Sequence, residues 1–307
     1  MKTIFILNPG AGKHKDISKT EQRIKEVCSK IGVSADTYIT KCPDDGRKFV
    51  KDYCAQHGKA RFIACGGDGT LAEVVNGACG CEGAEIGVMP MGTGNDFCRN
   101  FPKECNFSDI EAQLKGKTTK CDVIKYTGDT GATGYGVNMF NIGFDCNVAD
   151  MTAVMKTKPF VSGSLAYFLS IFAILVRKKG ANLAIEMDGK LIHKGPLLLT
   201  SIANGSFCGG GVKSNPLACI NDGMMDVNVV YNVSRTTFLS KLPYYMKGTH
   251  VGLKNIEKII SGHKCRKMTV TPLEGKMRLC ADGEIYDAGK IEFEVMRDAL
   301  NFVLPVK

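Results

Sequence analysis

The chain has 307 residues, 44% hydrophobic and 23% charged, a composition typical of a soluble globular protein with one or two domains. Its formal net charge of +9 suits an anionic ligand or an acidic lipid surface. Lys and Arg form no run interleaved with aromatic residues, which argues against nucleic acid as a partner.

The 14 cysteines show no spacing typical of a disulfide framework. Cys79 and Cys81 are too close together for the usual zinc-binding pair, and the sequence has no second pair that could complete a zinc site. The sequence begins Met1-Lys2-Thr3 and enters a strand pattern at once, without the pattern of a secretory signal. We therefore expect reduced thiols and a cytoplasmic protein.

Strand and helix patterns alternate in the first third of the chain. Strand patterns cover residues 3–7, 34–40, 61–65 and 85–89. Helix patterns cover residues 18–31, 46–57 and the segment after Thr70, and Gly32 and Gly58 end the first two. This βαβαβ rhythm predicts a parallel sheet with helices on its faces. Ligands of such sheets bind outside the carboxyl ends of the strands. The segments at those ends are residues 8–12, Thr40, 66–70 and 91–97.

After about Lys125, strand patterns dominate and are separated by turns rich in Gly, Asn and Asp. They cover residues 136–142, 183–187, 191–193, 197–203, 225–231, 267–271, 276–280, 291–295 and 300–304. This texture predicts an antiparallel β domain.

Residues 160–176 are strongly apolar, although three serines and a glycine interrupt them. The stretch is shorter than the roughly 20 residues that a helix needs to cross a bilayer. We expect a buried core helix, with a helix lining an apolar substrate cleft as the alternative, and no transmembrane span.

Residues 66–70 read Gly-Gly-Asp-Gly-Thr between a strand pattern and a helix pattern. Small residues let backbone N–H groups approach a phosphate, and the start of a helix adds further donors and a partial positive charge. Asp68 adds a carboxylate where a hard metal ion bridging nucleotide phosphates would lie. This combination indicates phosphoryl chemistry.

A second cluster, Gly92-Thr93-Gly94-Asn95-Asp96-Phe97, follows the strand pattern at 85–89. Taken alone, it reads equally well as a turn in which Asp96 caps the next helix. The second Gly-Asp turn on the same sheet edge favours a ligand site, because two carboxylates and phosphate oxygens together make a magnesium site.

The sequence resembles the diacylglycerol kinase catalytic family, which includes bacterial lipid kinases and the sphingosine and ceramide kinases. The matching motifs are residues 8–12 (NPGAG), 66–70 (GGDGT), 92–97 (GTGNDF), 121–123 (CDV), 141–145 (NIGFD), 221–227 (NDGMMDV) and 282–284 (DGE). The resemblance implies an α/β plus all-β fold: an N-terminal three-layer α/β domain with a parallel sheet, like that of NAD and diacylglycerol kinases, and a C-terminal antiparallel β-sandwich-like domain. We place these domains at 1–125 and 126–295, with residues 296–307 returning to the first.

The resemblance implies that Mg²⁺ and ATP bind to the first domain. It assigns to ATP the residues Asn8, Pro9, Gly10, Ala11, Gly12, Thr40, Gly66, Gly67, Asp68, Gly69, Thr70, Leu71, Ala72, Thr93 and Asn95. Asp68, Asp96 and Asp122 would bind the magnesium of Mg-ATP, directly or through water. Ala11 stands where the family often has serine, so one phosphate-contacting hydroxyl is lost. Lys13 could still meet a phosphate as a point charge.

The resemblance also implies that Glu284 takes the proton from a lipid hydroxyl, with Asp282 assisting the magnesium or the base. From the residues alone, Asp282-Gly283-Glu284 reads as a hairpin turn. In the family, the turn near Asp222 holds a structural magnesium, which here would bind the Cys219 carbonyl, Asp222 and the Met224 carbonyl. A plain Asn-Asp-Gly turn is the alternative.

We therefore expect an ATP-dependent lipid kinase with diacylglycerol as the leading acceptor and phosphatidic acid as the product. A lipid acceptor implies peripheral contact with the inner face of the membrane, and the family suggests a homodimer. GGDGT also resembles motifs of NAD kinases and phosphofructokinases, so a kinase of a soluble metabolite is the nearest alternative. A non-catalytic nucleotide-binding regulatory protein is a second, but the retained acidic residues argue against it.

Overall fold

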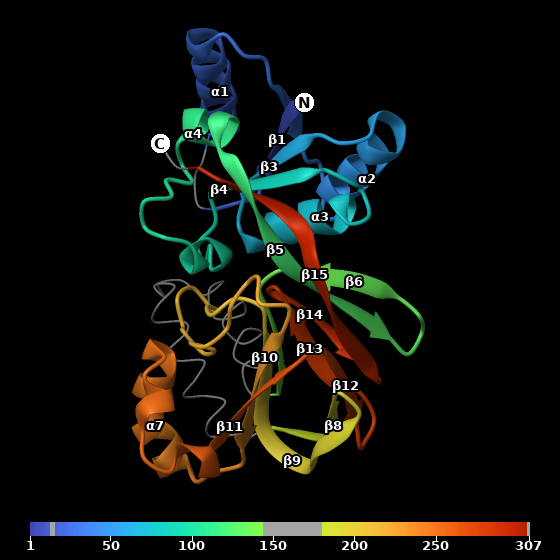
Figure 1. The fold of residues 1–307 in the computed structure, drawn as a ribbon, viewed down its shortest axis with the longest axis vertical. Helices are drawn as coiled ribbons and strands as arrows, with labels where there is room; N and C mark the ends of the chain where they lie inside the picture. Colours follow the sequence, from blue (N-terminus) through green and yellow to red (C-terminus); the bar gives the residue numbers. More distant parts are fainter. Residues whose placement is uncertain (13–15, 144–179, 306–307) are drawn as a thin grey trace, which may run out of the picture.

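Residues 1–12, 16–143 and 180–305 are described in a computed structural model of the chain. Figure 1 shows an α/β region at one end of the molecule, which holds both termini, and a β-rich region at the other. Lys13, Phe144, Asp145 and the apolar stretch 160–176 lie outside the described residues.

The α/β region is built on four parallel strands in the order β4-β3-β1-β2. These are β1 (Thr3–Leu7), β2 (Asp36–Ile39), β3 (Arg61–Gly66) and β4 (Glu85–Pro90). The helices are α1 (Ile17–Ile31), α2 (Asp45–His57), α3 (Asp68–Ala78) and α4 (Ile110–Lys115), and a 3-10 turn, η1, covers Phe97–Asn100. The predicted parallel sheet is confirmed, and Gly32 and Gly58 end α1 and α2 as expected.

The β-rich region is antiparallel, as predicted. Its strands are β6 (Thr133–Gly136), β7 (Met139–Gly143), β8 (Ala181–Met187), β9 (Lys190–Ala203), β10 (Met225–Tyr231), β11 (Ile260–Cys265), β12 (Lys267–Pro272), β13 (Met277–Ala281) and β14 (Glu284–Ala288). The two short patterns at 191–193 and 197–203 are one strand, β9, which pairs with β8 on both sides of Gly195, a residue whose φ of 137° favours glycine. The helix α7 (Arg235–Lys247) carries Pro243 in its interior and was not predicted.

Two long strands join the regions (Figure 1). They are β5 (Lys117–Gly128) and β15 (Ile291–Leu304), which pair with each other along almost their whole length. The patterns at 291–295 and 300–304 merge into β15, whose register shifts between Met296 and Leu300. The end of β15 pairs in parallel with β4, so one sheet runs through both regions. Phe302 of β15 packs edge-on to Phe97 with ring centroids 5.0 Å apart.

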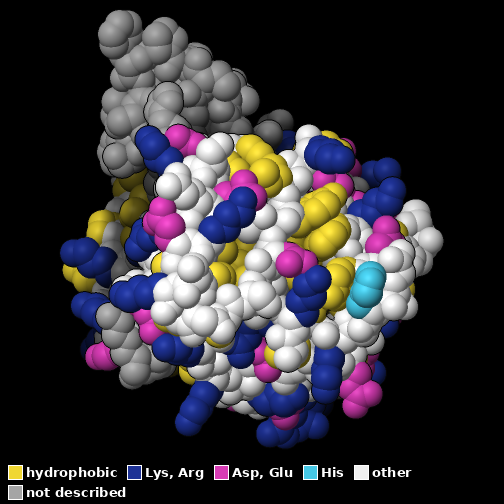
Figure 2. All heavy atoms as spheres, turned by 90° about the horizontal axis from the view of Figure 1, so that it is seen from above, with side chains coloured by type: hydrophobic (Ala, Val, Ile, Leu, Met, Phe, Trp, Pro, Cys, Tyr) yellow, Lys and Arg dark blue, Asp and Glu magenta, His cyan; other side chains and the backbone are white. Residues whose placement is uncertain are grey.

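The surface of the α/β end carries much of the charge. Figure 2 shows Lys and Arg side chains spread over this face and interspersed with acidic ones, rather than gathered into one continuous stripe. Among the described residues, no helix is long and apolar enough to cross a membrane.

Candidate active site

The two glycine-rich turns lie against each other at the carboxyl ends of β3 and β4. The Met91 N–H donates to the Gly66 carbonyl at 2.7 Å. A Cβ added to Gly92 would lie 2.5 Å from the Gly67 Cα, so only glycine allows this approach of the two backbones. We call the edge formed by residues 8–12, Thr40, 66–72 and 91–97 the carboxyl edge.

Asp68 and Asp96 meet on this edge. Asp68 begins α3, and its Oδ1 accepts hydrogen bonds from the backbone N–H of Asp96 at 2.8 Å and of Phe97 at 3.3 Å. A Cβ added to Gly94 would lie 2.8 Å from Asp68 Oδ2 and 3.5 Å from Asp96 Oδ2, so both carboxylates face one point. Asp96 Oδ2 also accepts from the Gly210 N–H at 2.8 Å, which brings the β-rich region to the edge.

The environment of these two carboxylates fits a divalent cation. Burial raises the pKa of Asp68 and of Asp96, and the Asp68 charge raises the pKa of Asp96 further. Asp96 Oδ1 is buried and accepts no hydrogen bond from the described residues, although Arg99 Nε lies 3.3 Å away. Two converging acids with an unsatisfied oxygen make the donor set that Mg²⁺ prefers.

The loop at residues 8–12 is hydrogen-bonded to α3, the helix that Asp68 begins. Asn8 Nδ2 donates to Thr70 Oγ1 at 2.9 Å, and Asn8 Oδ1 accepts from the Gly10 N–H at 2.9 Å. Gly12 adopts a φ of 74°, which favours glycine there. Thr40 is buried, and its N–H donates to the Leu7 carbonyl at 2.9 Å. The carboxyl edge therefore gathers the predicted segments from four strands.

The side chains of two residues predicted to contact ATP instead contact the protein itself. The Leu71 side chain is only 1% exposed and belongs to the hydrophobic core, so only its backbone is available to a ligand. Asn95 bonds the Gly92 backbone through both ends of its amide, at 3.1 and 2.8 Å, and so shapes its own turn. Thr93 is exposed beside it.

Asp282 lies in the turn between β13 and β14 with a φ of 44°. Its carboxylate accepts from three consecutive backbone N–H groups, those of Val137 at 2.8 Å, Asn138 at 3.2 Å and Met139 at 2.8 Å. Burial raises the pKa of Asp282 to about 6, although these three donors lower it, and the Asp68 charge raises it further. Asp282 therefore fixes the turn, and its oxygens are engaged by the protein backbone.

Glu284 begins β14 and is exposed. Partial burial and the charges of Glu73 and Asp44 raise its pKa, while Arg47 lowers it. These neighbours stand on α3 and at the start of α2, so the turn of the β-rich region faces the α/β region. A carboxyl with a raised pKa is suited to accepting a proton near neutral pH.

Asp122, the third acid predicted to bind the magnesium of Mg-ATP, lies among backbone donors. It is fully buried on β5, with Oδ2 accepting from the Gly223 N–H at 2.6 Å and Oδ1 from the Asp298 N–H at 2.9 Å. Both oxygens therefore hold backbone segments that lie far away in the sequence. Asp122 thus helps to hold the fold together here, and its link to the magnesium of Mg-ATP stays a prediction.

The turn predicted to hold a structural magnesium is closed by an ion pair. Asp222 Oδ2 lies 2.6 Å from Lys264 Nζ, and Asp222 Oδ1 accepts from the Met224 N–H at 3.0 Å. Lys264 stands opposite Asp226 in the β10–β11 pairing. In this arrangement the Lys264 ammonium group pairs with the one carboxylate of the set Cys219, Asp222 and Met224, so a metal there would have to displace it. Metal binding at this turn stays a prediction.

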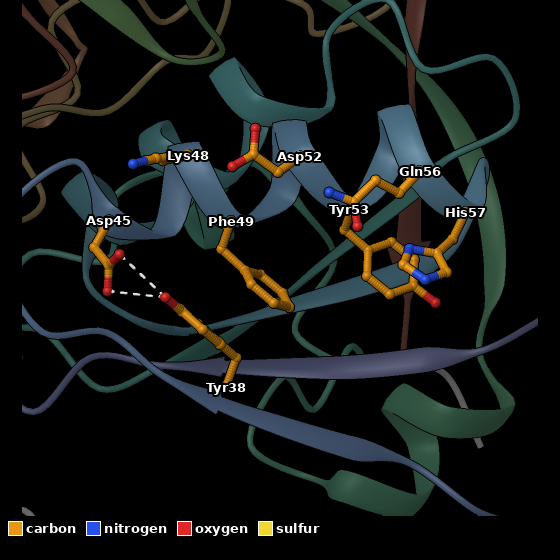
Figure 3. Close-up of a pocket in the computed structure, with 8 residues that line it drawn as sticks. All are labelled: Tyr38, Asp45, Lys48, Phe49, Asp52, Tyr53, Gln56 and His57. Carbon is orange, nitrogen blue, oxygen red and sulfur yellow. Dashed lines mark hydrogen bonds between the residues drawn. The ribbon is translucent and has the colours of Figure 1, made fainter.

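A separate pocket of about 380 Å³ lies between β2 and α2 (Figure 3). Tyr38 stacks on Phe49 there with centroids 3.7 Å apart, and its hydroxyl donates to Asp45. No residue predicted to bind ATP, metal or acceptor lines this pocket. We therefore place the chemistry at the carboxyl edge.

Sequence reasoning missed Asn76, which binds the Tyr135 backbone, and Glu73 and Arg47, whose charges act on Glu284. A signal for two of them was present. Glu73 and Asn76 are polar, partly exposed and three positions apart in a helix whose other face is buried. Such spacing marks one side of a helix, opposite the core-facing residues.

Comparisons with known proteins agree with this geometry. Residues 2–126 match the model of the diacylglycerol kinase catalytic domain, and residues 138–304 match that of the YegS C-terminal NAD kinase beta sandwich-like domain. A protein named diacylglycerol kinase from Bacillus subtilis is 28% identical over 98% of this chain and 95% of its own. A Shewanella frigidimarina protein named "Probable lipid kinase YegS-like" is 28% identical over 98% of this chain and 93% of its own.

A solved structure shows the same fold. The crystal structure of a diacylglycerol kinase from Bacillus anthracis superposes with a TM-score of 0.71 at 19% identity, covering 99% of this chain and 96% of that one. The two family models together span nearly all of the described residues. The chain therefore belongs to the diacylglycerol kinase catalytic-domain family, with a YegS-type C-terminal domain.

Proposed function

We propose that this protein transfers the γ-phosphoryl group of ATP to the hydroxyl of a lipid, with diacylglycerol as the leading acceptor. One observation carries the proposal. The turn at 282–284 faces the α/β region: the charges of Glu73 on α3 and of Asp44 and Arg47 at the start of α2 act on Glu284, and the Asp68 charge acts on Asp282. Asp68 in turn converges with Asp96 on the carboxyl edge. An acidic metal site and a carboxylate base on facing regions are the parts that phosphoryl transfer to a hydroxyl requires.

The carboxyl edge would hold the nucleotide. Asp68 and Asp96 would bind Mg²⁺, which when bound neutralises phosphate charge. The backbone of residues 8–12 and 66–72, with the N-terminus of α3, suits the phosphates. Asn8 and Asn95 hold these loops in shape before the nucleotide arrives. Asp122 and the turn at 219–224 are left out of this set, because their polar atoms already hold the β-rich region together.

Glu284 would act as the general base. Its carboxylate takes the proton of the acceptor hydroxyl as that oxygen forms a bond to the γ-phosphorus and the bond to the ADP oxygen breaks. Asp282 keeps the Glu284 turn in place through the three N–H groups it binds. A well-placed base contributes a factor of roughly 10²–10⁴ to such a rate.

The lipid acceptor is inferred from the relatives, whose names are diacylglycerol kinase and lipid kinase. Contact with the membrane surface and a cytoplasmic location follow from a lipid acceptor and belong to the same proposal. A kinase of NAD remains the alternative, since the second matched domain is described as NAD kinase beta sandwich-like.

The test is an assay with ATP labelled at the γ-phosphate, Mg²⁺ and a panel of acceptors. The panel contains diacylglycerol, monoacylglycerol, sphingosine and phosphatidylglycerol in detergent micelles, and NAD in buffer. We expect label in the organic phase, with the highest rate for diacylglycerol. Label on NAD alone would overturn the lipid assignment, and nucleotide binding without transfer to any acceptor would favour a regulatory protein.

The matched control is Glu284→Gln, which keeps the shape of the side chain and removes the base. Turnover should fall by roughly 10²–10⁴-fold with unchanged ATP affinity. If ATP affinity were lost instead, Glu284 would belong to the nucleotide site and not to proton transfer.

A further inference from the structure

Four polar side chains of α3 each form hydrogen bonds with a different segment of the chain. Asp68 binds the backbone of residues 96 and 97, and Thr70 accepts from Asn8 at 2.9 Å. One turn further on, Glu73 accepts from the Asp44 N–H at 3.0 Å and the Gly46 N–H at 3.1 Å. Glu73 thereby caps α2, which has no side-chain cap of its own. The fourth residue in this series, Asn76, reaches the other region of the molecule.

Asn76 binds the backbone of Tyr135 at two points. Its Nδ2 donates to the Tyr135 carbonyl at 2.7 Å, and its Oδ1 accepts from the Tyr135 N–H at 2.9 Å. Nδ2 also donates to the Ala72 carbonyl at 2.9 Å. A primary amide carries both a donor and an acceptor at this spacing, whereas a carboxylate carries only acceptors. Figure 1 shows the contact in context, with α3 beside β6 where the two regions meet.

A short link leads from this contact to the Asp282 turn. Tyr135 is two residues before Val137, the first of the three N–H donors to Asp282. The Asp282 N–H in turn donates to the Met139 carbonyl at 3.0 Å. The link passes close to the turn, since a Cβ added to Gly136 would lie 3.2 Å from Asp282 Oδ2 and would touch the Phe140 ring. Glu284 follows two residues after Asp282.

We propose that Asn76 is a positioning residue that holds the Glu284 turn in register with the Asp68 end of the same helix. The proposal rests on the function above, because it concerns the distance between the base and the nucleotide. Both ends of the connection are rigid. Asp68 and Asn76 share one helix, and residues 135–139 are hydrogen-bonded at both ends. Since a misplacement of about 1 Å can cost roughly 10²-fold in rate, this contact bears directly on turnover.

The experiment compares Asn76→Ala with Asn301→Ala in the full chain. Asn301 is a fitting control because its Nδ2 also donates to a backbone carbonyl, that of Ala84 at 2.9 Å, beside the amino end of β4 and so at the opposite end of that strand from the carboxyl edge. Three quantities are measured for each variant: kcat with diacylglycerol micelles, the Kd of Mg-ADP, and ATP hydrolysis without lipid relative to transfer.

We expect Asn76→Ala to lower kcat by roughly 10–100-fold with the Kd of Mg-ADP within about twofold of wild type. The ratio of hydrolysis to transfer should rise, because the γ-phosphate stays bound while the base is displaced. Asn301→Ala should leave all three quantities within about twofold of wild type, even if it lowers the melting temperature. A loss of fold alone cannot produce that split between kcat and nucleotide affinity.

Asn76→Asp is the second variant, in case Asn76→Ala fails to fold. It keeps the side-chain shape and the acceptor for the Tyr135 N–H but loses both donated bonds, so kcat should again fall. The positioning role is overturned if folded Asn76→Asp has the kcat of the wild type, or if Asn76→Ala and Asn301→Ala have equal kinetics. In either case the assignment as a lipid kinase stands. A wild-type protein that phosphorylates no lipid overturns the function first, and with it this proposal.

Discussion

Two pairs of aspartates, all four within motifs of the same family, have opposite surroundings in this molecule. Asp68 and Asp96 converge on Gly94, and the buried Asp96 Oδ1 accepts no hydrogen bond from the described residues, with Arg99 Nε 3.3 Å away. Asp122 and Asp222 instead have each carboxylate oxygen matched, by the N–H groups of Gly223 and Asp298 in one case and by Lys264 and the Met224 N–H in the other.

The difference separates an electrostatic site from a structural one. Desolvation and mutual repulsion raise the pKa of Asp96, so the first pair gains free energy from an incoming cation. The second pair has its carboxylate oxygens engaged within the fold, and removing a partner of the buried Asp122 would leave its carboxylate unsatisfied. We therefore expect the first pair to control activity and the second to control stability.

The largest effect should come from Asp68→Asn. Asn keeps an oxygen for the Asp96 and Phe97 N–H groups but removes the charge that would bind Mg²⁺. We expect kcat/KM for Mg-ATP to fall by at least roughly 100-fold, and the melting temperature without metal to stay level or rise. Steady-state kinetics and thermal unfolding measure both. If Asp68→Asn instead lowered the melting temperature and left kcat/KM unchanged, Asp68 would belong with the structural pair.

Asp122→Asn should show the opposite result. The amide keeps one acceptor but turns an NH₂ group toward a backbone N–H, so one of the two charge-assisted bonds is lost. The free energy of unfolding should fall by about 2–3 kcal/mol, while kcat per folded molecule stays within about twofold. Urea unfolding followed by active-site titration measures this. A large drop in kcat of the folded fraction would return Asp122 to the metal site.

Lys264→Met sharpens the comparison further, because it leaves the Asp222 carboxylate without its cation. The pair is partly exposed, with side chains 41% and 29% accessible, so the loss should be about 0.5–1 kcal/mol. Added Mg²⁺ should stabilise this variant and not the wild type at that turn. Thermal unfolding with and without chelator, in the absence of nucleotide, measures it. Equal stabilisation of Lys264→Met and its double variant with Asp222→Asn would contradict a site at Asp222.

The smallest effect concerns pH. Partial burial and the Glu73 and Asp44 charges raise the pKa of Glu284, and Arg47 lowers it. Because the base must be ionised, activity should fall as the pH drops through that raised pKa. Removing the Arg47 charge by Arg47→Gln raises the pKa further and should move the acid limb of the kcat profile slightly upward. A shift to lower pH would show that Arg47 does not face Glu284.

The sequence predicted the carboxyl edge well, because strand and helix patterns with glycine-rich turns at 66–70 and 92–97 are local signals. The partners of Asp122 and Asp222 could not be predicted in this way. Gly223 lies 101 positions from Asp122, and Lys264 lies 42 positions from Asp222, so only the folded sheet brings them together. The resemblance assigned these acids to metal sites but did not reveal which of them have partners within the fold. Asn76 was overlooked for the same reason, since Tyr135 is 59 positions away.

The most direct test counts metal ions. Mn²⁺ replaces Mg²⁺ as a spectroscopic probe, and its binding in the presence of ATP is measured by electron paramagnetic resonance for the wild type, Asp68→Asn and Asp222→Asn. The electrostatic account predicts that Asp68→Asn loses the nucleotide-dependent Mn²⁺ and that Asp222→Asn binds it like the wild type. The account would be contradicted if Asp68→Asn bound Mn²⁺ as well as the wild type does. It would also be contradicted if only Asp222→Asn lost the Mn²⁺ ion that the wild type binds.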